Sequence, residues 1–404
     1  MNNDNRSFYN DITKLSNGVK RILIGVIAIL ALVTVVSCAT EHREPVPVPQ
    51  PSQIAPDFYK GDLKWPEIEH ILHSSSVGRI ISIGQEYPYS VPVSFVYFEG
   101  KICIHSSQRG TKIENIKKND KVCFVVDRYN EKEGWASINI FGQANIVNDP
   151  AKRGELMAKF DAAYNSPAGQ VESSVAQAKS QPLAIPVAMI EIIPEKITNR
   201  VLSVPSSWLT KFPYIIDGQI PGNQGMVSGA HGGSTKETPD EVTKWTLSSC
   251  AMGRLNTFTD GYPNSTPVNY SYFDGKVYIH SRNYGAKIDD LKQGRKVSFS
   301  VDRFNRERWL SVNVFGAARL ISDPSEMAIL MEKYTAVFNA EAEDIDEAVK
   351  DVKEPDAGMK ASIERMAKRM VLIEITPEQI TGRINNVKLN SSKLPYTLEN
   401  ELLK

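Results

Sequence analysis

The 404-residue sequence lacks net charge, since its Lys and Arg residues and its Asp and Glu residues number 47 each. A nucleic-acid-binding protein needs a basic face to offset phosphate charge, so this balance argues against that class. Cysteine is also scarce. The four cysteines and six histidines show no metal-type spacing, which argues against a metal site. The length allows two or three domains of ordinary size.

Long apolar runs are also missing, with one exception near the N-terminus. Lys20 and Arg21 precede an uncharged run over 22–36, which is short for a membrane span and typical of a signal-peptide core. The run is followed by Ser and Cys, and this end resembles a bacterial lipobox with Cys38 as the lipidated residue. We therefore expect residues 1–38 to be a lipoprotein signal peptide. It would leave the protein extracytoplasmic, anchored to a bacterial membrane on its periplasmic or cell-surface side. An uncleaved anchor and a cleaved secreted form are the alternatives.

The cysteines beyond Cys38 are odd in number. Cys103 and Cys123 lie in apolar, strand-like segments, where a buried thiol packs as a small hydrophobic side chain. Because an oxidising compartment permits disulfides, a Cys103–Cys123 bond is the alternative.

The strongest feature of the sequence is an internal repeat. Residues 78–106, GRIISIGQEYPYSVPVSFVYFEGKICIHS, correspond to residues 253–281, GRLNTFTDGYPNSTPVNYSYFDGKVYIHS, and the similarity continues through 109–130 and 284–305. Similarity of this length indicates one domain present twice. The predicted organisation is a Pro-rich linker over 39–60, a first domain over 61–203, a Gly/Pro/Ser-rich linker over 204–238, a second domain over 239–390 and a C-terminal tail over 391–404.

Each copy is predicted to be mainly β, with a few helices (α+β). Segments rich in β-branched and aromatic residues, separated by turn signals such as Glu99-Gly100, predict short antiparallel strands. Asp149-Pro150 and Asp323-Pro324 each predict a helix start, and the second copy has an additional charged helical segment over roughly 340–368. These elements predict a small closed or partly closed β-barrel in each copy.

A polar set recurs in both copies. A strand ends in serine, a glycine-containing turn follows, and a lysine opens a helix-like segment. A hydroxyl, free backbone N–H groups and an ammonium group in this order can hold one phosphate, although Gly-Xaa-Lys turns are also common on surfaces without that role. The candidates are Arg79, Ser106 and Lys112 in the first copy and Arg254, Ser281 and Lys287 in the second.

Four motifs in combination resemble the pyridoxamine-5′-phosphate-oxidase-like, FMN-binding split-barrel family, in its nitroimidazole-resistance-type branch. They are the opening GRI or GRL, the YPYSVPVSFVY and YPNSTPVNYSY strands, the IHS step followed by Gly-Xaa-Lys, and the KVxFxVD strand. The resemblance covers about 61–203 and 240–387. It implies two tandem FMN-binding split β-barrels in which these serines and lysines contact the FMN phosphate, with Arg79 and Arg254 assisting.

The resemblance also implies that the backbone of one strand in each copy runs along the flavin ring. These segments are Pro92, Val93 and Ser94 in the first copy and Pro267, Val268 and Asn269 in the second. The sequence departs from the oxidase proper at Val91 and Thr266, where that enzyme has an arginine. This departure argues against pyridoxamine-phosphate oxidation.

Two further matched pairs are candidates. His105 and His280 match the characteristic histidine of this branch, which implies a catalytic role as a ring contact or a proton donor to a reduced substrate. A histidine at a strand end is often only a hydrogen-bonded structural residue, and that reading stays open. Trp135 and Trp309 either cover a flavin from the neighbouring domain or pack in the core.

In this family the cofactor lies between two protomers, so a tandem duplication would supply both from one chain. We expect the two copies to form a pseudo-dimer within one chain, so that the protein is a monomer with up to two FMN sites. Its expected partners are a small-molecule substrate and the membrane, which it would contact through its lipid. The leading hypothesis is an FMN-dependent, nitroreductase-like oxidoreductase. One alternative is a haem-binding or haem-degrading protein with His105 or His280 as iron ligand. The other is a non-catalytic flavin-binding lipoprotein.

Overall fold

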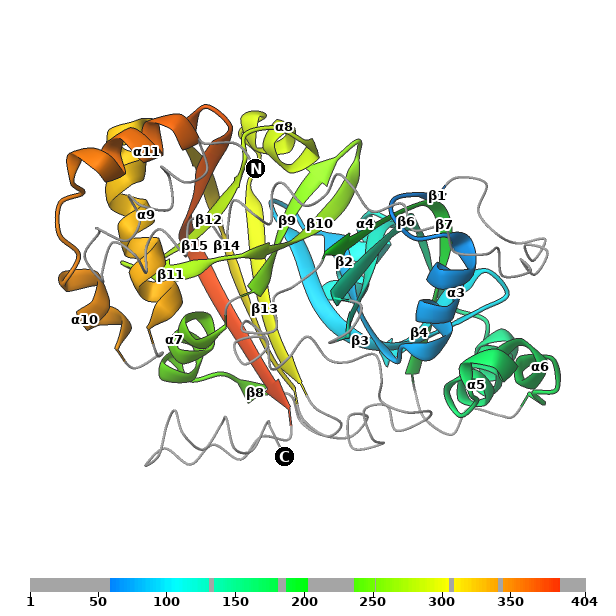
Figure 1. Cartoon of the computed structure of the whole chain (residues 1–404). Coiled ribbons are helices and arrows are strands. Elements are labelled where there is room, and N and C mark those ends of the chain that lie inside the picture. The colour runs from blue at the N-terminus through cyan, green and yellow to red at the C-terminus, as the bar shows by residue number, and fades with distance from the viewer. Residues whose placement is uncertain are drawn as a thin grey trace, which may run out of the picture. The chain divides into compact units, whose positions relative to one another are not determined.

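A computed structural model describes residues 59–130, 134–180, 187–202, 236–250, 252–304, 309–340 and 344–385. These residues form two curled β-sheets in tandem, each accompanied by short helices (Figure 1). The predicted mainly β fold with two tandem domains is therefore confirmed. Cys38 and the predicted signal peptide lie outside the described residues. Within the described part of the chain, no helix combines the length and the apolar character needed to cross a membrane.

The first sheet closes into a barrel. Its strands follow the order β1-β7-β4-β3-β2-β5-β6, and β6 also pairs with β7, which completes the ring. Every pair is antiparallel except that of β1 with β7. The strands are β1 (Tyr59–Lys60), β2 (Val77–Ile83), β3 (Pro88–Phe98), β4 (Lys101–Ser107), β5 (Lys121–Asn130), β6 (Gly134–Val147) and β7 (Val187–Leu202).

The second sheet repeats this order but stays open at one point. Its strands follow the order β10-β9-β13-β14-β15-β12-β11, with β8 beside β15. The counterpart of the continuous strand β3 is interrupted at Tyr270, and the sheet is therefore a curled half-barrel. The strands are β8 (Lys236–Glu237), β9 (Met252–Thr259), β10 (Tyr262–Asn269), β11 (Ser271–Phe273), β12 (Lys276–Arg282), β13 (Val297–Phe304), β14 (Trp309–Ile321) and β15 (Met370–Asn385).

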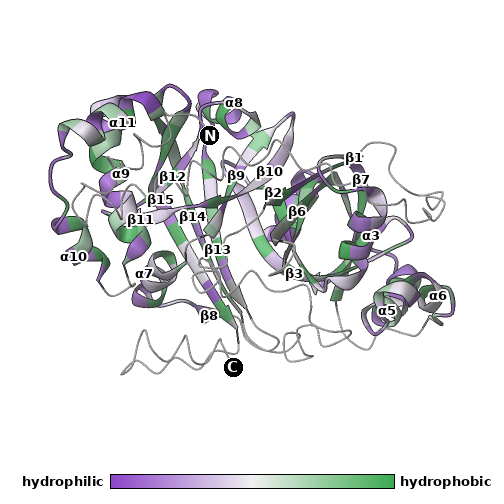
Figure 2. Cartoon of the chain, viewed as in Figure 1, coloured by the Kyte–Doolittle hydropathy of each residue, from purple (hydrophilic) through white to green (hydrophobic). Residues whose placement is uncertain are grey.

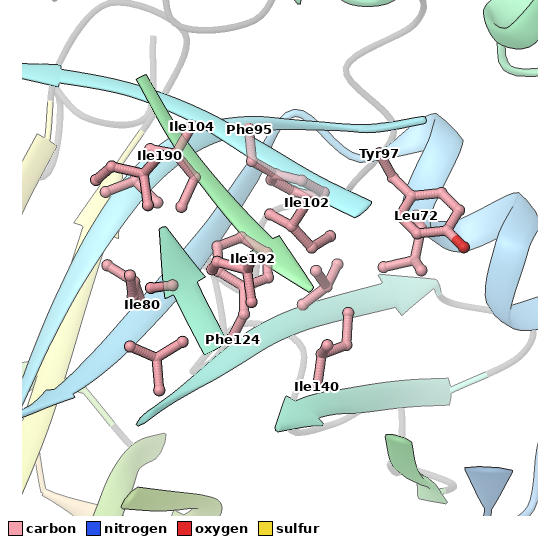
Figure 3. Close-up of a cluster of buried hydrophobic side chains, with 14 of the residues drawn as sticks. Leu72, Ile80, Phe95, Tyr97, Ile102, Ile104, Phe124, Ile140, Ile190 and Ile192 are labelled. Atoms are coloured by element: carbon pink, nitrogen blue, oxygen red, sulfur yellow. The ribbon is translucent and has the colours of Figure 1, made fainter. Parts of the chain in front are cut away.

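Aliphatic and aromatic side chains fill the first barrel. Figure 3 shows Ile80, Phe95 and Phe124 gathered in one cluster with Ile140 and Ile192, each from a different strand. The rings of Phe95 and Phe124 meet edge to face with their centroids 4.9 Å apart, a geometry that favours aromatic pairs. Because successive strand residues face opposite sides of a sheet, the residues between these core positions lie on the outside of the barrel.

A glycine in each copy lets the two longest strands bend. The register of β6 and β7 shifts between Phe141 and Gly142, and a Cβ on Gly142 would lie only 2.2 Å from the carbonyl oxygen of Ile193. The second copy has the same bulge at Gly316, where a Cβ would lie 2.1 Å from the Thr376 oxygen. The strands, predicted to be short, reach 14 residues in β6 and 16 in β7 because the bulge curves them around the barrel.

Two helices begin where the Asp-Pro pairs predict. Asp149 caps α5 (Pro150–Tyr164) by accepting a hydrogen bond from the backbone N–H of Lys152 at 2.7 Å, and Asp323 caps α9 (Pro324–Asn339) in the same way. The additional segment of the second copy is helical, as predicted. It forms α10 (Ile345–Lys350) and α11 (Ala357–Ala367), in which hydrophobic and hydrophilic residues are mixed (Figure 2). The remaining helices are α3 (Trp65–Ser74), α4 (Thr111–Lys118), η1 (Ala168–Gln170), α6 (Val171–Ala176), α7 (Asp240–Ser249) and α8 (Ala286–Lys292).

Cys103 and Cys123 are buried free thiols. Cys103 packs in a cluster with residues of α5 and α6, whereas Cys123 packs with Ile81 in a separate cluster. The prediction that they serve as small hydrophobic side chains is therefore confirmed, and the alternative of a disulfide between them is wrong.

The two copies contact each other through matched residues. The hydroxyl of Tyr87 donates to Glu378 at 2.6 Å, and the Lys296 ammonium lies 5.0 Å from the centre of the Tyr87 ring. The same contact recurs with the copies exchanged, among Tyr262, Glu195 and Lys121. This reciprocity is the pattern expected of a two-fold interface.

The copies nevertheless differ in the chemistry of their outward positions near this contact. The first copy has an apolar cluster there, made of Ile81, Cys123, Val125 and Phe141. At the positions of Ile81, Cys123 and Val125 the second copy has Asn256, Ser298 and Ser300. Asn256 Nδ2 donates to Ser298 Oγ at 3.1 Å and to Ser300 Oγ at 3.4 Å. One face is thus apolar and the other is hydrogen-bonded.

Candidate functional site

Arg79 and Arg254, predicted to assist phosphate binding, lie in a buried ion cluster between the copies. Arg79 donates from Nε to Asp302 at 2.5 Å and from Nη1 to Asp127 at 3.2 Å. Arg254 donates from Nε to Asp127 at 2.8 Å, and its Nη1 lies 3.7 Å from Asp302. No side chain of the four is more than 6% exposed. The structure therefore commits both guanidinium groups to carboxylates of the chain.

Asp127 is held in its ionised form. Burial alone would raise the pKa of Asp127, but Arg254 and Arg79 outweigh burial and hold that pKa below its ordinary value. On the other carboxylate, Ser311 Oγ donates to Asp302 at 2.5 Å. The two positive and two negative charges compensate each other, which is the condition for burying them.

The glycine-containing turns have the backbone conformation that their sequence requires. Gly110 has φ +117° and Gly285 has φ +106°, a region that side-chain-bearing residues rarely adopt. Each glycine directly precedes the helix that carries the candidate lysine, α4 or α8. The turn therefore sets the direction in which each helix, with its lysine, starts after the preceding strand.

Lys112 and Lys287 are the second residues of these helices and are half-buried. Burial lowers the pKa of Lys112 to about 8. Burial, with a smaller effect of Arg282, also lowers the pKa of Lys287. Neither ammonium group has a carboxylate partner among the described residues. A bound anion would stabilise the charged form of both lysines.

Ser106 and Ser281 are the next-to-last residues of β4 and β12, before the turns. Ser106 is half-buried. Ser281 is 6% exposed, and its Oγ lacks a hydrogen-bond partner within the described structure. A buried hydroxyl without a partner is costly, so this oxygen is a position where a ligand or a water would be stabilising.

The structure separates each candidate histidine from the serine that follows it. Ile104 and Ile279 belong to the two barrel cores. Ser106 and Ser281, two residues further along each strand, therefore lie on the same inner face at the strand end. His105 and His280 lie on the outer face. The sequence places histidine and serine together at one turn, but the alternation of the strand directs them to opposite sides.

The predicted ring-contact segment of the first copy shares this outer face. Val93 points into the barrel core, so Pro92 and Ser94 lie on the outside of β3. The pairing of β3 with β4 sets Phe95 opposite Ile104, and continuing that register by one residue leads to Ser94 and His105.

The second copy has the same arrangement with one polar difference. Val268 points into the core, so Pro267 and Asn269 lie outside. Extending the register that sets Ser271 opposite Tyr278 brings Asn269 alongside His280. The Nδ2 of Asn269 is buried and has no hydrogen-bond partner in the described part of the chain. The second copy thus carries unpartnered buried polar atoms at two predicted cofactor contacts, Ser281 and Asn269.

The histidines also differ in the ring against which they pack. His105 lies edge to face against Phe160 of α5, with the ring centres 4.7 Å apart. His280 lies edge to face against Tyr334 of α9, and its Nδ1 is 3.2 Å from the Tyr334 hydroxyl. Burial and, to a smaller extent, Lys287 lower the pKa of His280 to about 4. His280 is therefore neutral near pH 7, with the ammonium group of Lys287 close by.

Trp135 and Trp309 lie at or next to the start of the long strands β6 and β14. Their side chains lie outside what the structure describes, so the two roles proposed for them stay predictions.

Sequence reasoning missed three residues that contact Arg79, Arg254 or His280 in the structure. Asp127 and Asp302 were visible as the repeated aspartate of the KVxFxVD strand, and their recurrence in an apolar strand could have marked them as buried ion-pair partners. Tyr334 had no such signal, because its counterpart in the first copy is Phe160.

Comparison with known families gives one match that covers most of the chain. Residues 64–201 and 241–384 each match the family described as pyridoxamine 5′-phosphate oxidase. A search of curated proteins found no match.

Solved structures resemble parts of this chain at low sequence identity. A FAD-binding protein from Mesorhizobium loti is 22% identical, covers 39% of this chain and 100% of its own, and has a TM-score of 0.29. A putative 5-nitroimidazole antibiotic resistance protein from Bacteroides thetaiotaomicron is 15% identical, covers 38% of this chain and 89% of its own, and has a TM-score of 0.30. A FAD- and haem-binding protein from Mycobacterium smegmatis is 13% identical, covers 39% of this chain and 73% of its own, and has a TM-score of 0.28.

Proposed function

Because the chain belongs to the pyridoxamine 5′-phosphate oxidase family, we propose that it binds FMN and uses the cofactor to reduce a small molecule, as a nitroreductase does. The observation that carries the proposal is the presence, in each copy, of a half-buried lysine that follows a positive-φ glycine and lacks a carboxylate partner among the described residues. These lysines are Lys112 and Lys287.

The electrostatics of the lysines support binding of a phosphate. Burial destabilises the ammonium group of Lys112 and of Lys287, and the chain offers neither of them a compensating carboxylate within its described residues. A phosphate dianion would supply that compensation through a charge-assisted hydrogen bond. The unpartnered Oγ of Ser281 offers a further hydrogen bond in the second copy.

The outer face of β3–β4 and its counterpart support the placement of the flavin ring. Pro92 and Ser94 lie there with His105 in the first copy, as do Pro267 and Asn269 with His280 in the second. When bound, FMN would supply the electron transfer. The chain's own residues would hold its phosphate and orient its ring.

The proposal is tested by the absorption spectrum of the purified protein and by FMN titration. Lys112→Ala and Lys287→Ala should each weaken binding at their own site by about ten- to a hundredfold, since a hydrogen bond to a charged group contributes ~1.5–3 kcal/mol. Lys117→Ala and Lys292→Ala are matched controls, because these lysines lie exposed on the same two helices and should leave FMN affinity unchanged.

The outcomes separate the alternatives. Unchanged FMN retention in the Lys112→Ala/Lys287→Ala double variant would reject the phosphate assignment. A sharp Soret band in place of flavin bands would support the haem alternative. If FMN binds, the flavin is reduced with dithionite under anaerobic conditions and mixed with a nitroaromatic compound. Reoxidation no faster than that of free reduced FMN would favour a non-catalytic flavin-binding protein.

We also propose that the chain is a lipoprotein anchored outside the cytoplasm. The support is the sequence alone: two basic residues, an uncharged run over 22–36, and Cys38 in a lipobox-like context. Expression in a bacterial host should place the protein in the membrane fraction, and Cys38→Ala should abolish lipid labelling. A soluble, unlabelled wild-type protein would refute this part of the proposal.

A further inference from the structure

The two copies differ at one position that touches the candidate histidine. Asp149-Pro150 and Asp323-Pro324 begin the equivalent helices α5 and α9, and the same helical position then carries Phe160 in the first copy and Tyr334 in the second. Both rings meet a histidine edge to face. Only the tyrosine of this pair brings a hydroxyl to it.

The Tyr334 hydroxyl is held at His280 by the packing around it. The Tyr334 side chain is 2% exposed, and its residue accepts a hydrogen bond at the backbone oxygen from Ser271 Oγ at 3.0 Å. Its hydroxyl oxygen lies 3.2 Å from Nδ1 of His280. Because Tyr334 is fixed by this packing, the contact restricts how the imidazole can rotate.

The direction of this hydrogen bond follows from the chemistry of the two groups. A neutral imidazole has one N–H and one acceptor nitrogen, and a phenol is a better donor than acceptor. The favoured pairing is therefore donation from the Tyr334 hydroxyl to Nδ1 of His280. That pairing leaves the imidazole proton on Nε2, because the hydrogen bond made by one ring nitrogen sets the state of the other.

We propose that Tyr334 is a positioning residue that fixes His280 as its Nε2–H tautomer, so that Nε2–H and Nδ2–H of Asn269 form a two-donor site for a carbonyl oxygen of the flavin ring. The inference rests on the proposed function, because it assumes that FMN binds at this face. In the first copy, Phe160 and Ser94 replace Tyr334 and Asn269, so that copy lacks both parts of the site.

Asn269 is the second observation that points to a ligand. Its Nδ2 is buried without a hydrogen-bond partner among the described residues, and the register of β11 with β12, continued past the interruption at Tyr270, leads from Asn269 to His280. An unsatisfied buried donor is costly unless a ligand or water accepts its hydrogen bond. Two N–H donors on adjoining parts of the sheet would suit an oxygen that carries more negative charge in the reduced flavin than in the oxidised one.

The tautomer is measured by long-range ¹H–¹⁵N correlation spectra of the protein labelled at histidine nitrogen, without added FMN. We expect His280 to show a protonated Nε2 and an unprotonated Nδ1 in the wild type. In Tyr334→Phe we expect the ¹⁵N chemical shifts of the two His280 ring nitrogens to move toward the average of the two tautomers. Phe160→Tyr is the matched gain variant: it brings the same hydroxyl to His105 and should shift that histidine toward the Nε2–H form. A proton on Nδ1 of His280 in the wild type, or an unchanged spectrum in Tyr334→Phe, would overturn the assignment.

The ligand is measured separately by FMN titration in Lys112→Ala, which leaves the second-copy site to be observed. Tyr334→Phe and Asn269→Ala should each weaken FMN binding by about three- to tenfold in that background, the effect of one hydrogen bond. Unchanged affinity in both variants would overturn the two-donor site. If no FMN binds to the wild type, the proposed function fails, and so does the two-donor site, while the tautomer result still decides whether Tyr334 positions His280.

Discussion

Replacing Asp127 with Asn should show that the buried ion cluster contributes more to the free energy of unfolding than an ordinary surface ion pair does. Asp127 is the carboxylate that both Arg254 and Arg79 contact, at 2.8 Å and 3.2 Å for two of these bonds, and its side chain is 2% exposed. The substitution removes one negative charge and leaves two guanidinium groups facing Asp302 alone. Breaking a buried ion pair from one side costs about 3–5 kcal/mol. We expect the free energy of unfolding to fall by about that amount.

Urea denaturation followed by tryptophan fluorescence and circular dichroism measures the change. Asp346→Asn is the matched control, because Lys244 and Asp346 form an ion pair at 3.2 Å with both side chains largely exposed, and its loss should cost less than about 1 kcal/mol. Replacing all four cluster residues by apolar residues of similar volume should restore most of the stability lost in Asp127→Asn. A loss below about 1 kcal/mol in Asp127→Asn, equal to that of the control, would refute the reasoning.

Further predictions concern pH and backbone. The pKa of Asp127 is lower in the folded protein than in the unfolded chain, so the stability it contributes is fully present above about pH 4 and is lost as the pH falls further; unfolding free energies at pH 7 and pH 3 should differ less in Asp127→Asn than in the wild type. Gly142→Ala should destabilise by about 3 kcal/mol because its Cβ would meet a carbonyl oxygen, whereas Gly169→Ala has open space and should change little; equal melting temperatures for the two variants would contradict this. Asp149→Ala and Asp323→Ala should each lower unfolding free energy by about 1 kcal/mol through loss of a helix cap, and denaturation curves matching the wild type would show that the caps contribute nothing.

Much of the fold could be predicted because the repeat supplies two independent versions of each local pattern. The Asp-Pro helix starts and the helical insertion of the second copy appear where the sequence indicates them. Strand lengths were underestimated, since a bulge at Gly142 depends on the close approach of a distant carbonyl group, and the sequence near the glycine does not reveal that contact.

The candidate site was predictable in composition but not in arrangement. The lysines, serines and histidines recur at fixed spacing, and this is enough to select them. The alternation of side chains along β4 separates His105 from Ser106, and tertiary packing decides which of the two faces the barrel core. Arg79 and Asp302 are more than two hundred positions apart in the chain. Their ion pair therefore depends on contact between the copies, which local sequence does not reveal.

The unlike faces of the two copies have an evolutionary consequence. In a homodimer, every substitution appears in both subunits at once, so an asparagine introduced for Ile81 would change both copies of the interface. Here a single codon change alters one side only, and Ile81 and Asn256 can coexist. The fused chain can thus explore combinations that no symmetric assembly could encode, and one half can keep an inherited task while the other acquires a different one.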